Sequence, residues 1–358
     1  MPDVYYWCRG QDDNIGDVLL RRRFLRELRC LGEVHVLIGG ASEGFIGAMS
    51  FDKSDVLYRS QAAWLKALYR AAIRRGVVLA ANPGEVRVDM KSALAYSSII
   101  PAQVLSRWRG GKSLQLGVAV KGKHPILRIP VTIFGKNSEL QSFREEVAAS
   151  PDAPVYPDWA FDESRDTHDM VVARRDICAV TYRVDRPMLS ECALEAIRRV
   201  CSERDLKIVV FSQVRRDNSR TRELASALGG DVILWEDDVS HSDQERKIRD
   251  LMARSELVVS DRIHALIMGT SEGATPLGLI PGPDVKVGPH FAAASIARIS
   301  GDITSLDTDT VADFIRGVID RRTEIQARVG VARARVADLG EAVRLVEAGA
   351  RDGSGGLA

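Results

Sequence analysis

Short apolar runs alternate with amphipathic segments along most of the chain. This alternation is typical of strand–helix units that build a parallel sheet with helices on both faces. In the first half, the apolar runs predict strands and the segments between them predict helices. The expected strands are 4–7, 34–38, 77–80 and 114–120, and the expected helices are 18–31, 62–75 and 91–108.

A second series of the same kind begins near Asp176. Its expected strands are 177–182, 207–214, 231–235, 256–260 and 275–280, with expected helices at 189–204, 219–228, 242–253 and 263–270. One Rossmann-like unit thus follows another, which predicts an α/β fold of two domains. We expect a ligand cleft between these domains.

The polar segment 162–170 has no hydrophobic periodicity and separates the two series, so we place the linker there. The expected parts are an N-terminal domain over 1–165, a C-terminal domain over 166–305 and a last part over 306–358. Apolar spacing in 309–347 predicts one or two amphipathic helices, and the composition of 352–358 predicts disorder.

Composition changes this picture mainly by exclusion. The chain has 358 residues, of which 45% are hydrophobic and 28% are charged, and its formal net charge is only +1. Such a balance gives no general attraction to nucleic acid, so we expect no nucleic-acid partner and any anion to be bound locally. The five cysteines lack CxxC spacing, which favours a reducing cytoplasm without a zinc site.

Membrane attachment has no strong signal in the sequence. Nowhere do about eighteen uninterrupted apolar residues occur, so no transmembrane segment is expected. The basic cluster 21–29 has the spacing of a solvated helix face; the alternative is contact with anionic lipid, or with a lipid-linked glycan, at the inner membrane face. We expect a cytoplasmic protein, and a homo-oligomer is compatible with the sequence.

The stretch SDRIHA places Arg262 and His264 where the expected strand 256–260 turns into the helix 263–270. In doubly wound sheets, ligands bind beyond the carboxyl ends of strands, where the next helix presents unpaired N–H groups. An arginine there can hold a carboxylate or phosphate through two hydrogen bonds, and an imidazole can transfer a proton. The alternative is a surface arginine beside a histidine that caps the first helical turn.

A second candidate, DDNIGDVLL, follows the first expected strand. Asn14 can cap the next helix, Gly16 permits a close backbone approach, and Asp17 suits the first turn of a helix. The spacing favours a helix start, and the functional alternative is binding of sugar hydroxyls or supply of a base.

Two further cations come after strands of the second domain. Arg183 follows the strand 177–182, and Lys286 lies in a Gly- and Pro-rich loop after the strand 275–280. Each alone is more often a solvated loop cation. Because the carboxyl ends of parallel strands share one edge, we expect these cations to converge with Arg262 on a ligand that carries two anionic groups.

Taken in order along the chain, these residues resemble the polysaccharide pyruvyl transferase family. The family's N-x-G-D segment is matched by Asn14, Gly16 and Asp17, and its P-D-x-A segment by Pro157, Asp158 and Ala160. Its G-V-S-L-R strand end is matched loosely by 179–183, and its S-x-R-x-H-A signature by Ser260, Arg262, His264 and Ala265. Lys286 matches the lysine that follows the next strand.

The chain departs from the family pattern at two places. A glycine pair after a middle strand of the first domain is replaced here by Asn82, Pro83 and Gly84. The serine of the G-V-S-L-R element is Thr181. The cations expected on the donor side are still present. The departures from the family pattern affect the expected acceptor side.

The resemblance implies a two-domain fold of the glycosyltransferase-B type. It also implies transfer of pyruvate from phosphoenolpyruvate to a sugar as a cyclic ketal, with a hexose-containing and in some cases lipid-linked glycan as acceptor, and with no cofactor or metal. His264 is then the expected general acid or base. The expected donor-binding residues are Arg262, Arg183, Lys286, Thr181 and Ser260. Asn14, Gly16 and Asp17 are expected on the acceptor side, with Asp17 also as a base.

Two other functions remain open. One is a glycosyltransferase that uses a nucleotide-sugar, since helix N-termini and arginines also bind diphosphates. An acidic residue would then grip the ribose, and the candidates are Glu236, Asp237 and Asp238. The other is a non-catalytic member of the family that binds glycans.

Overall fold

The computed structural model describes residues 1–145, 154–163 and 174–348. The chain divides into two compact units, and each unit gathers separate stretches of sequence. Unit 1 contains Met1–Asp12, Leu20–Trp159 and the chain from Arg335 onward. Unit 2 contains Asp13–Leu19 and Ala160–Ala334.

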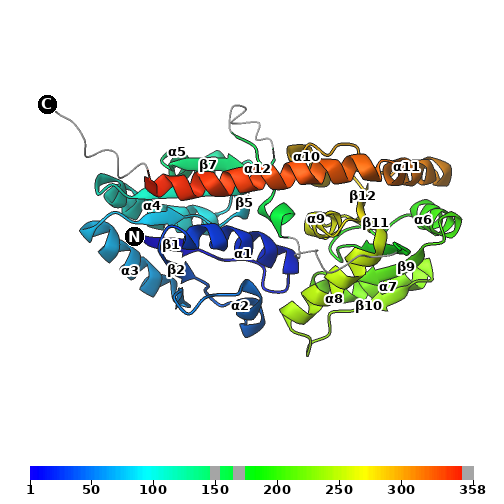
Figure 1. Ribbon diagram of the computed structural model, residues 1–358, viewed down its shortest axis with the longest axis horizontal. Helices are drawn as coiled ribbons and strands as arrows, with labels where there is room; N and C mark the ends of the chain where they lie inside the picture. Colours follow the sequence, from blue (N-terminus) through cyan, green and yellow to red (C-terminus); the bar gives the residue numbers. More distant parts are fainter. Residues whose placement is uncertain (146–153, 164–173, 349–358) are drawn as a thin grey trace. The chain divides into compact units, whose positions relative to one another are not determined.

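Unit 1 is built on a parallel sheet with helices on its faces (Figure 1). The strand order is β3-β2-β1-β4-β6-β5, and β7 pairs with β6. The strands are β1 (Asp3–Trp7), β2 (Glu33–Leu37), β3 (Val56–Tyr58), β4 (Val78–Ala80), β5 (Gly84–Arg87), β6 (Lys112–Lys121) and β7 (Leu140–Phe143). The helices are α1 (Ile15–Arg29), α2 (Glu43–Met49), α3 (Gln61–Arg74), α4 (Met90–Trp108) and α5 (Pro125–Lys136). The short 3₁₀ turn Trp159–Asp162 lies at the boundary between the units.

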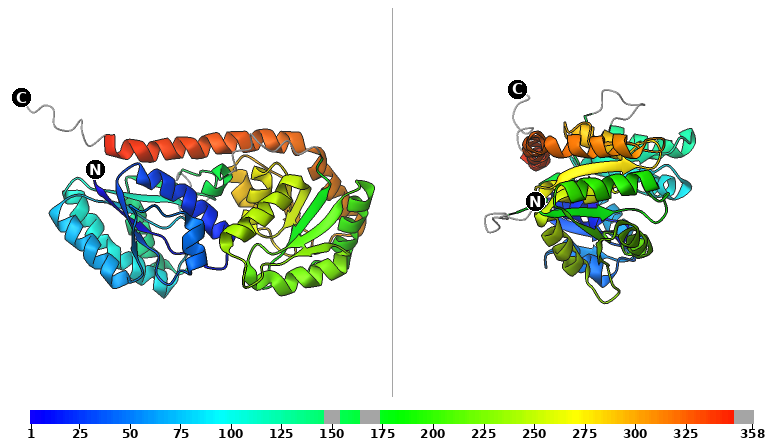
Figure 2. Two further views of the ribbon diagram at one scale, coloured as in Figure 1. Left: turned by 60° about the horizontal axis from the view of Figure 1, so that its bottom comes forward. Right: turned by 90° about the vertical axis from the view of Figure 1, so that its right-hand side faces the viewer.

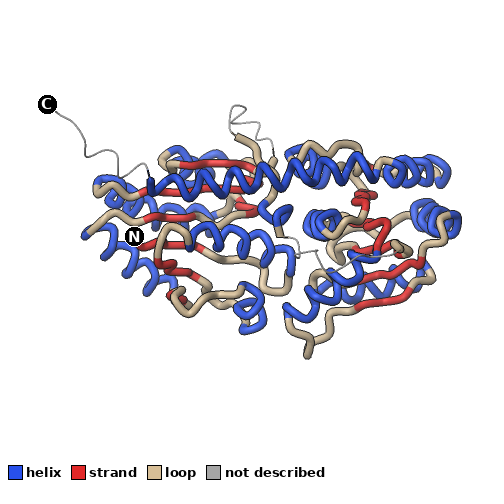
Figure 3. The backbone as a smooth tube through the Cα atoms, viewed as in Figure 1, coloured by secondary structure: helices blue, strands red, loops and turns tan. Residues whose placement is uncertain are grey.

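Unit 2 has a second parallel sheet, in the order β10-β9-β8-β11-β12-β13. Its strands are β8 (Ile177–Thr181), β9 (Lys207–Phe211), β10 (Asp231–Ile233), β11 (Ser255–Ser260), β12 (Thr275–Ile280) and β13 (Ser300–Asp302). Its helices are α6 (Glu191–Glu203), the 3₁₀ turn Arg215–Asp217, α7 (Asn218–Leu228), α8 (His241–Arg254), α9 (Ile263–Ser271), α10 (Val287–Ala293) and α11 (Thr308–Asp320). This is the Rossmann order, and the direction of winding reverses between β8 and β11. Figure 3 shows helices flanking the strands of each sheet.

All the strands and helices expected from apolar runs are confirmed, with ends that differ by a few residues. The central strands, such as β4, β8, β11 and β12, are buried on both faces, so they appear in the sequence as continuous apolar runs. The expectation missed several short elements that have no such run or are broken by proline and glycine. They are β3, β5, β7, α2, α5, α10 and β13.

The expected domain division differs from the observed one. The units separate between Trp159 and Ala160, and the expected linker 162–170 lies almost entirely outside the described residues. The expected last part, 306–358, is not a unit of its own, because α11 packs on α6 in unit 2. Helix α12 (Arg322–Ala348) contributes to both units, and its Val336, Leu339 and Val343 are buried. The expected disorder of 352–358 also lies outside the described residues.

The basic cluster 21–29 is not a solvated helix face, so that expectation is wrong. Arg21 and Arg23 are buried in unit 1. Arg21 donates to Asn82 Oδ1 at 2.9 Å and to the Arg9 carbonyl at 2.9 Å, and Arg23 pairs with Glu27 at 2.5 Å. Arg344 of α12 adds a second cation at 2.7 Å from Glu27, where α12 lies beside α1 (Figure 2). Arg21 and Arg23 therefore form hydrogen bonds and ion pairs within unit 1 and do not face solvent.

No helix of the described residues is both long enough and apolar enough to cross a membrane. The five cysteines are all free thiols, and three of them are buried.

Candidate functional site

The candidate site lies in unit 2 where β8 and β11 end side by side. Thr181 and Ser260 face each other in the register of these two strands. The Ser260 hydroxyl donates to the Thr181 carbonyl at 2.7 Å and accepts the Arg262 backbone N–H at 2.9 Å. Ser260 thus fixes the turn from β11 into α9. The Thr181 hydroxyl is buried and has no hydrogen-bond partner among the described residues.

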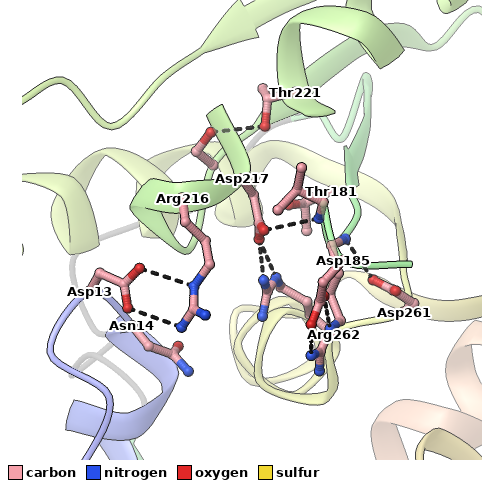
Figure 4. A network of polar contacts seen from close by, with 12 residues as sticks. Asp13, Asn14, Thr181, Asp185, Arg216, Asp217, Thr221, Asp261 and Arg262 are labelled. Atoms are coloured by element: carbon pink, nitrogen blue, oxygen red, sulfur yellow. Dashed lines mark hydrogen bonds and ion pairs between the residues drawn. The ribbon is translucent and has the colours of Figure 1, made fainter. Parts of the chain in front are cut away.

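Arg262 points toward a carboxylate that the sequence did not single out (Figure 4). Its Nε lies 2.5 Å from Asp217 Oδ2, and its Nη2 contacts the same oxygen. The Asp217 side chain is fully buried, that of Arg262 is 10% exposed, and Asp217 Oδ1 accepts the Val184 N–H at 3.1 Å. Among the described residues, Nη1 makes no hydrogen bond, so it is the nitrogen of Arg262 that remains for a ligand.

Burial dominates the electrostatics around this arginine. It raises the pKa of Asp217 and of Asp261, while the positive charge of Arg262 opposes both shifts. Burial also lowers the pKa of the Arg262 guanidinium, and the two carboxylates counteract it. An arginine remains protonated in proteins. Arg262 is therefore a cation whose charge stabilises the ionised forms of Asp217 and Asp261 against burial.

Arg183 stands at the end of β8 and has a carboxylate partner of its own. Its Nε and Nη2 donate to the two oxygens of Asp185 at 2.8 and 2.7 Å. Its backbone N–H donates to Asp261 Oδ1 at 3.1 Å, which ties the loop after β8 to the loop after β11. The hydrogen bonds from Arg183 hold the pKa of Asp185 well below its usual range. The structure therefore brings the two predicted arginines together, each with an acidic partner.

The segment 13–19 belongs to unit 2, whereas the sequence placed it in the N-terminal domain. Asn14 forms an antiparallel bridge with Val214, just after β9. The Arg215 N–H donates to the Asp13 carbonyl at 3.2 Å. Arg216 grips the Asp13 carboxylate with Nε at 3.1 Å and Nη2 at 3.3 Å (Figure 4). These contacts explain why the start of α1 groups with unit 2.

Gly16 lies directly against His264. A Cβ atom built on Gly16 would lie 2.4 Å from His264 Cβ and 2.5 Å from its Nδ1, so only glycine fits without displacing the histidine. Asn14 Oδ1 accepts the Gly16 N–H at 3.0 Å, which confirms the expected cap. Asp17 follows in the first turn of α1 and is half-buried. The N-x-G-D segment and His264 thus form one local cluster.

Lys286 immediately precedes α10, in the loop that follows β12, the strand next to β11. Asp284 caps this helix by accepting the backbone N–H groups of Val287 at 2.9 Å and Gly288 at 3.0 Å. The Lys286 carbonyl is hydrogen-bonded to His290 Nδ1 at 2.8 Å. Lys286 shares the sheet edge of the two arginines, and its convergence with them stays a prediction.

The acidic residues expected to bind a ribose in a nucleotide-sugar glycosyltransferase follow a different strand from the two arginines. Glu236, Asp237 and Asp238 are exposed in the loop after β10, the edge strand that is separated from β8 by β9. Asp237 lies 3.9 Å from Arg215.

Sequence reasoning missed Asp185, Asp217 and Asp261. Asp261 and Asp185 each lie within two residues of a predicted arginine, so a search for nearby acids would have found them. Asp217 ends the 3₁₀ turn after β9, and no local pattern marks it. Among the described residues, no group of three or more His, Cys, Asp or Glu side chains is placed to hold a metal ion.

Comparison with known proteins gives no match to a family model and none to a curated protein. Solved structures do match over nearly the whole chain. The UDP-GlcNAc 2-epimerase of Neisseria meningitidis bound to UDP-GlcNAc is 10% identical, with a TM-score of 0.56 and coverage of 98% of this chain and 100% of that chain. A glycosyltransferase of Rickettsia africae is 10% identical, with a TM-score of 0.56 and coverage of 98% and 97%. An Anabaena protein in complex with UDP and glucose is 10% identical, with a TM-score of 0.55 and coverage of 98% and 100%.

These likenesses show the fold. The expected α/β architecture with two Rossmann-like domains, of the glycosyltransferase-B type, is confirmed. The expected cleft between the domains stays a prediction.

Proposed function

We propose that this protein is a sugar-modifying enzyme that transfers the pyruvyl group of phosphoenolpyruvate to two hydroxyls of a sugar. The observation that carries the proposal is the placement of Arg183 and Arg262 at the ends of the adjacent strands β8 and β11. His264 stands in the first turn of the helix that follows, and Gly16 of the N-x-G-D segment packs on it. All of these residues belong to the resemblance described above.

The charges of the donor fit this arrangement. Phosphoenolpyruvate carries a carboxylate and a phosphate, which can each accept hydrogen bonds from an arginine. Asp217 is buried and fixed by Arg262 and by the Val184 N–H, so it stays in place. Asp185 is exposed and holds Arg183 from the solvent side, so an incoming anion can replace it. In this proposal Asp185 keeps Arg183 oriented until the donor arrives.

The chemistry requires a proton donor and a proton acceptor. His264 gives a proton to the methylene carbon of the donor, which places positive charge on the central carbon. One sugar hydroxyl attacks that carbon and loses its proton to a base, for which Asp17 is the candidate. The second hydroxyl then attacks the same carbon and its proton returns to His264. Phosphate leaves with the C–O bond electrons and takes the proton held by Asp17, and the cyclic ketal closes. The products are the ketal and inorganic phosphate.

A second candidate is a glycosyltransferase or epimerase that uses a nucleotide-sugar. The supporting observation is that proteins with this fold were crystallised with UDP-GlcNAc or with UDP and glucose. The N-terminus of α9 with Arg262 is equally suited to a diphosphate. The two candidates differ in the ligand at this one position.

Titration calorimetry with phosphoenolpyruvate and, separately, with UDP and UDP-sugars separates them. We expect phosphoenolpyruvate to bind. After incubation of the enzyme and phosphoenolpyruvate with a panel of galactosides, glucosides and mannosides, we expect mass spectrometry to detect a sugar that has gained pyruvate. His264→Ala should abolish phosphate release while leaving donor binding. Arg246→Ala removes an exposed arginine of α8 and is the matched control. Binding of UDP-sugars alone would overturn the proposal in favour of the second candidate.

A further inference from the structure

A long stretch of unit 1 carries charge of a single sign. Residues 90–138 contain eight lysines and arginines and no aspartate or glutamate, although the whole chain has a net charge of only +1. The stretch comprises α4, β6 and α5. Its basic residues are Lys91, Arg107, Arg109, Lys112, Lys121, Lys123, Arg128 and Lys136.

Helix α4 exposes an apolar stripe. Successive members are separated by three, four or seven residues, which places them on one face of an α-helix. Trp108, at the end of the stripe, is 79% exposed. The stripe consists of Met90, Leu94, Pro101, Val104 and Trp108. The opposite face of α4 is buried through Ala93, Tyr96, Ile99 and Ala102.

Helix α5 has a similar stripe made of Ile126, Ile129 and Ile133, and Ile126 is 67% exposed. Its Val131 and Phe134 join the same hydrophobic cluster as Tyr96 and Ile99 of α4, and the two helices pack together. Both stripes therefore face away from one shared core. Together the two helices supply seven of the fifteen large hydrophobic side chains that are exposed in the described part of the chain.

Most of the basic side chains around these stripes have no acidic partner. Lys112 pairs with Glu139 and Lys121 with Glu145. The other six form no ion pair with any described residue, namely Lys91, Arg107, Arg109, Lys123, Arg128 and Lys136. Five of these six are exposed and Arg128 is half-buried. The surface thus combines exposed apolar side chains with uncompensated positive charge.

We propose that this face of α4 and α5 binds the surface of an anionic phospholipid bilayer. The apolar stripes enter the boundary between head groups and acyl chains, and the basic side chains meet lipid phosphates. Neither helix is suited to cross the bilayer, so the contact is peripheral. A symmetric dimer through this face would bring two equally positive surfaces together, which argues against a second copy as the occupant.

This inference does not rest on the proposed function, because it concerns residues outside the candidate site. Trp108 provides a direct probe. Of the five tryptophans, Trp64, Trp159 and Trp235 are buried and Trp7 is half-buried, so Trp108 is the one that solvent reaches freely. Vesicles of phosphatidylcholine with about 30 mol% phosphatidylglycerol should shift its fluorescence to shorter wavelength, and pure phosphatidylcholine should not. Trp108→Phe should remove the shift.

Vesicle co-sedimentation then tests the two parts of the surface separately. We expect Leu94→Ser with Ile126→Ser, and Arg109→Glu with Lys123→Glu, each to weaken binding to the anionic vesicles about tenfold or more. Val285→Ser and Arg246→Glu change an exposed apolar and an exposed basic residue of unit 2 and should have no effect. Melting curves confirm that each variant is folded.

Two results would overturn the proposal. One is equal binding, or no binding, to anionic and neutral vesicles by the unchanged protein. The other is concentration-dependent dimerisation in sedimentation velocity that is lost in Leu94→Ser with Ile126→Ser, which would assign the face to a second copy of the chain.

Discussion

Arg249 and Arg262 are both arginines of unit 2 that face buried carboxylates, but they use their nitrogens differently. Arg249 in α8 donates from Nε to Glu245 at 2.9 Å, from Nη1 to Glu272 at 2.5 Å and from Nη2 to the Glu163 carbonyl at 2.8 Å. All three nitrogens are satisfied by the fold. Arg262 directs Nε and Nη2 to one oxygen of Asp217.

An arginine whose nitrogens are all bonded within the fold is structural, whereas one with an unbonded nitrogen can bind a ligand. Burial and a carboxylate partner are common to both. Only Arg262 stands at the end of a central strand, and only Arg262 has a nitrogen that no described residue occupies. Removing Arg249 should therefore cost stability, and replacing Arg262 should cost ligand binding.

The largest effect is expected from Arg249→Met. It leaves Glu245 and Glu272 buried without their cation, which should lower the free energy of unfolding by about 3–5 kcal/mol. Urea denaturation measures the loss. A change no larger than that of the exposed control Arg246→Met would show that the Arg249 cluster is not structural.

Arg262→Lys comes next. Lysine keeps the charge but lacks the planar fork that can hold Asp217 and a ligand together. We expect kcat/KM for the donor to fall about 10²-fold, with a change in unfolding free energy much smaller than for Arg249→Met. If the free energy of unfolding falls by as much as the transition-state stabilisation that the drop in kcat/KM represents, Arg262 is structural too. The proposed difference between Arg249 and Arg262 would then be wrong.

Gly16→Ala tests the contact with His264. The added Cβ would overlap the base of the imidazole, so the histidine must move, at a cost of about 1–3 kcal/mol of stability and with loss of turnover. Gly317 in α11 has nothing within 4 Å of an added Cβ, and Gly317→Ala should instead stabilise the protein by up to about 1 kcal/mol. Opposite signs in thermal melting are the expected result.

The pH dependence of the stability of Arg262→Met tests whether Arg262 stabilises the ionised form of Asp217. Burial raises the pKa of Asp217, and Arg262 opposes this, so the variant should have a still higher pKa at Asp217. A carboxyl with a raised folded-state pKa favours the folded state below its unfolded pKa, and this contribution is lost as the pH rises through the folded pKa. The loss of stability in the variant should thus be greatest at neutral pH and shrink toward about pH 4. Urea denaturation across this range measures it, and a loss that does not vary with pH would contradict the argument.

Asp185→Asn should have the smallest effect. Asp185 is exposed, so its pair with Arg183 should contribute no more than about 1 kcal/mol to stability. The variant frees Arg183 for an incoming anion, and calorimetry should therefore show donor affinity that is equal or a few-fold higher. Weaker donor binding would mean that Asp185 does more than hold Arg183 in place.

The sequence predicted the long elements because strands buried on both faces are continuous apolar runs. It placed Arg183, Ser260 and Arg262 at one sheet edge because strand ends share an edge. It could not predict Asp217, since an aspartate in a short turn after a strand carries no periodic signal. It also could not assign the segment 13–19 to unit 2, because that assignment rests on contacts with Val214 and Arg216 that are distant in sequence.

The basic cluster 21–29 and the stretch 90–138 show that a high density of basic residues does not by itself locate a positively charged surface. The cluster 21–29 has five arginines within nine residues and is largely consumed by contacts inside unit 1. The weaker-looking stretch 90–138 has no acidic residue, and its exposed cations stay uncompensated. A count of absent acids, rather than of clustered bases, is the signal that locates this surface.

The division of helix α12 between the units has a consequence for the order of folding during synthesis. Glu27 is buried and pairs with Arg344, which follows it by 317 residues along the chain. A ribosome releases the N-terminal residues first, yet unit 1 cannot cover Glu27 until the final helix has left the exit tunnel. Unit 2 extends no further than Ala334, so all its residues are available before α12 can close over Glu27 in unit 1.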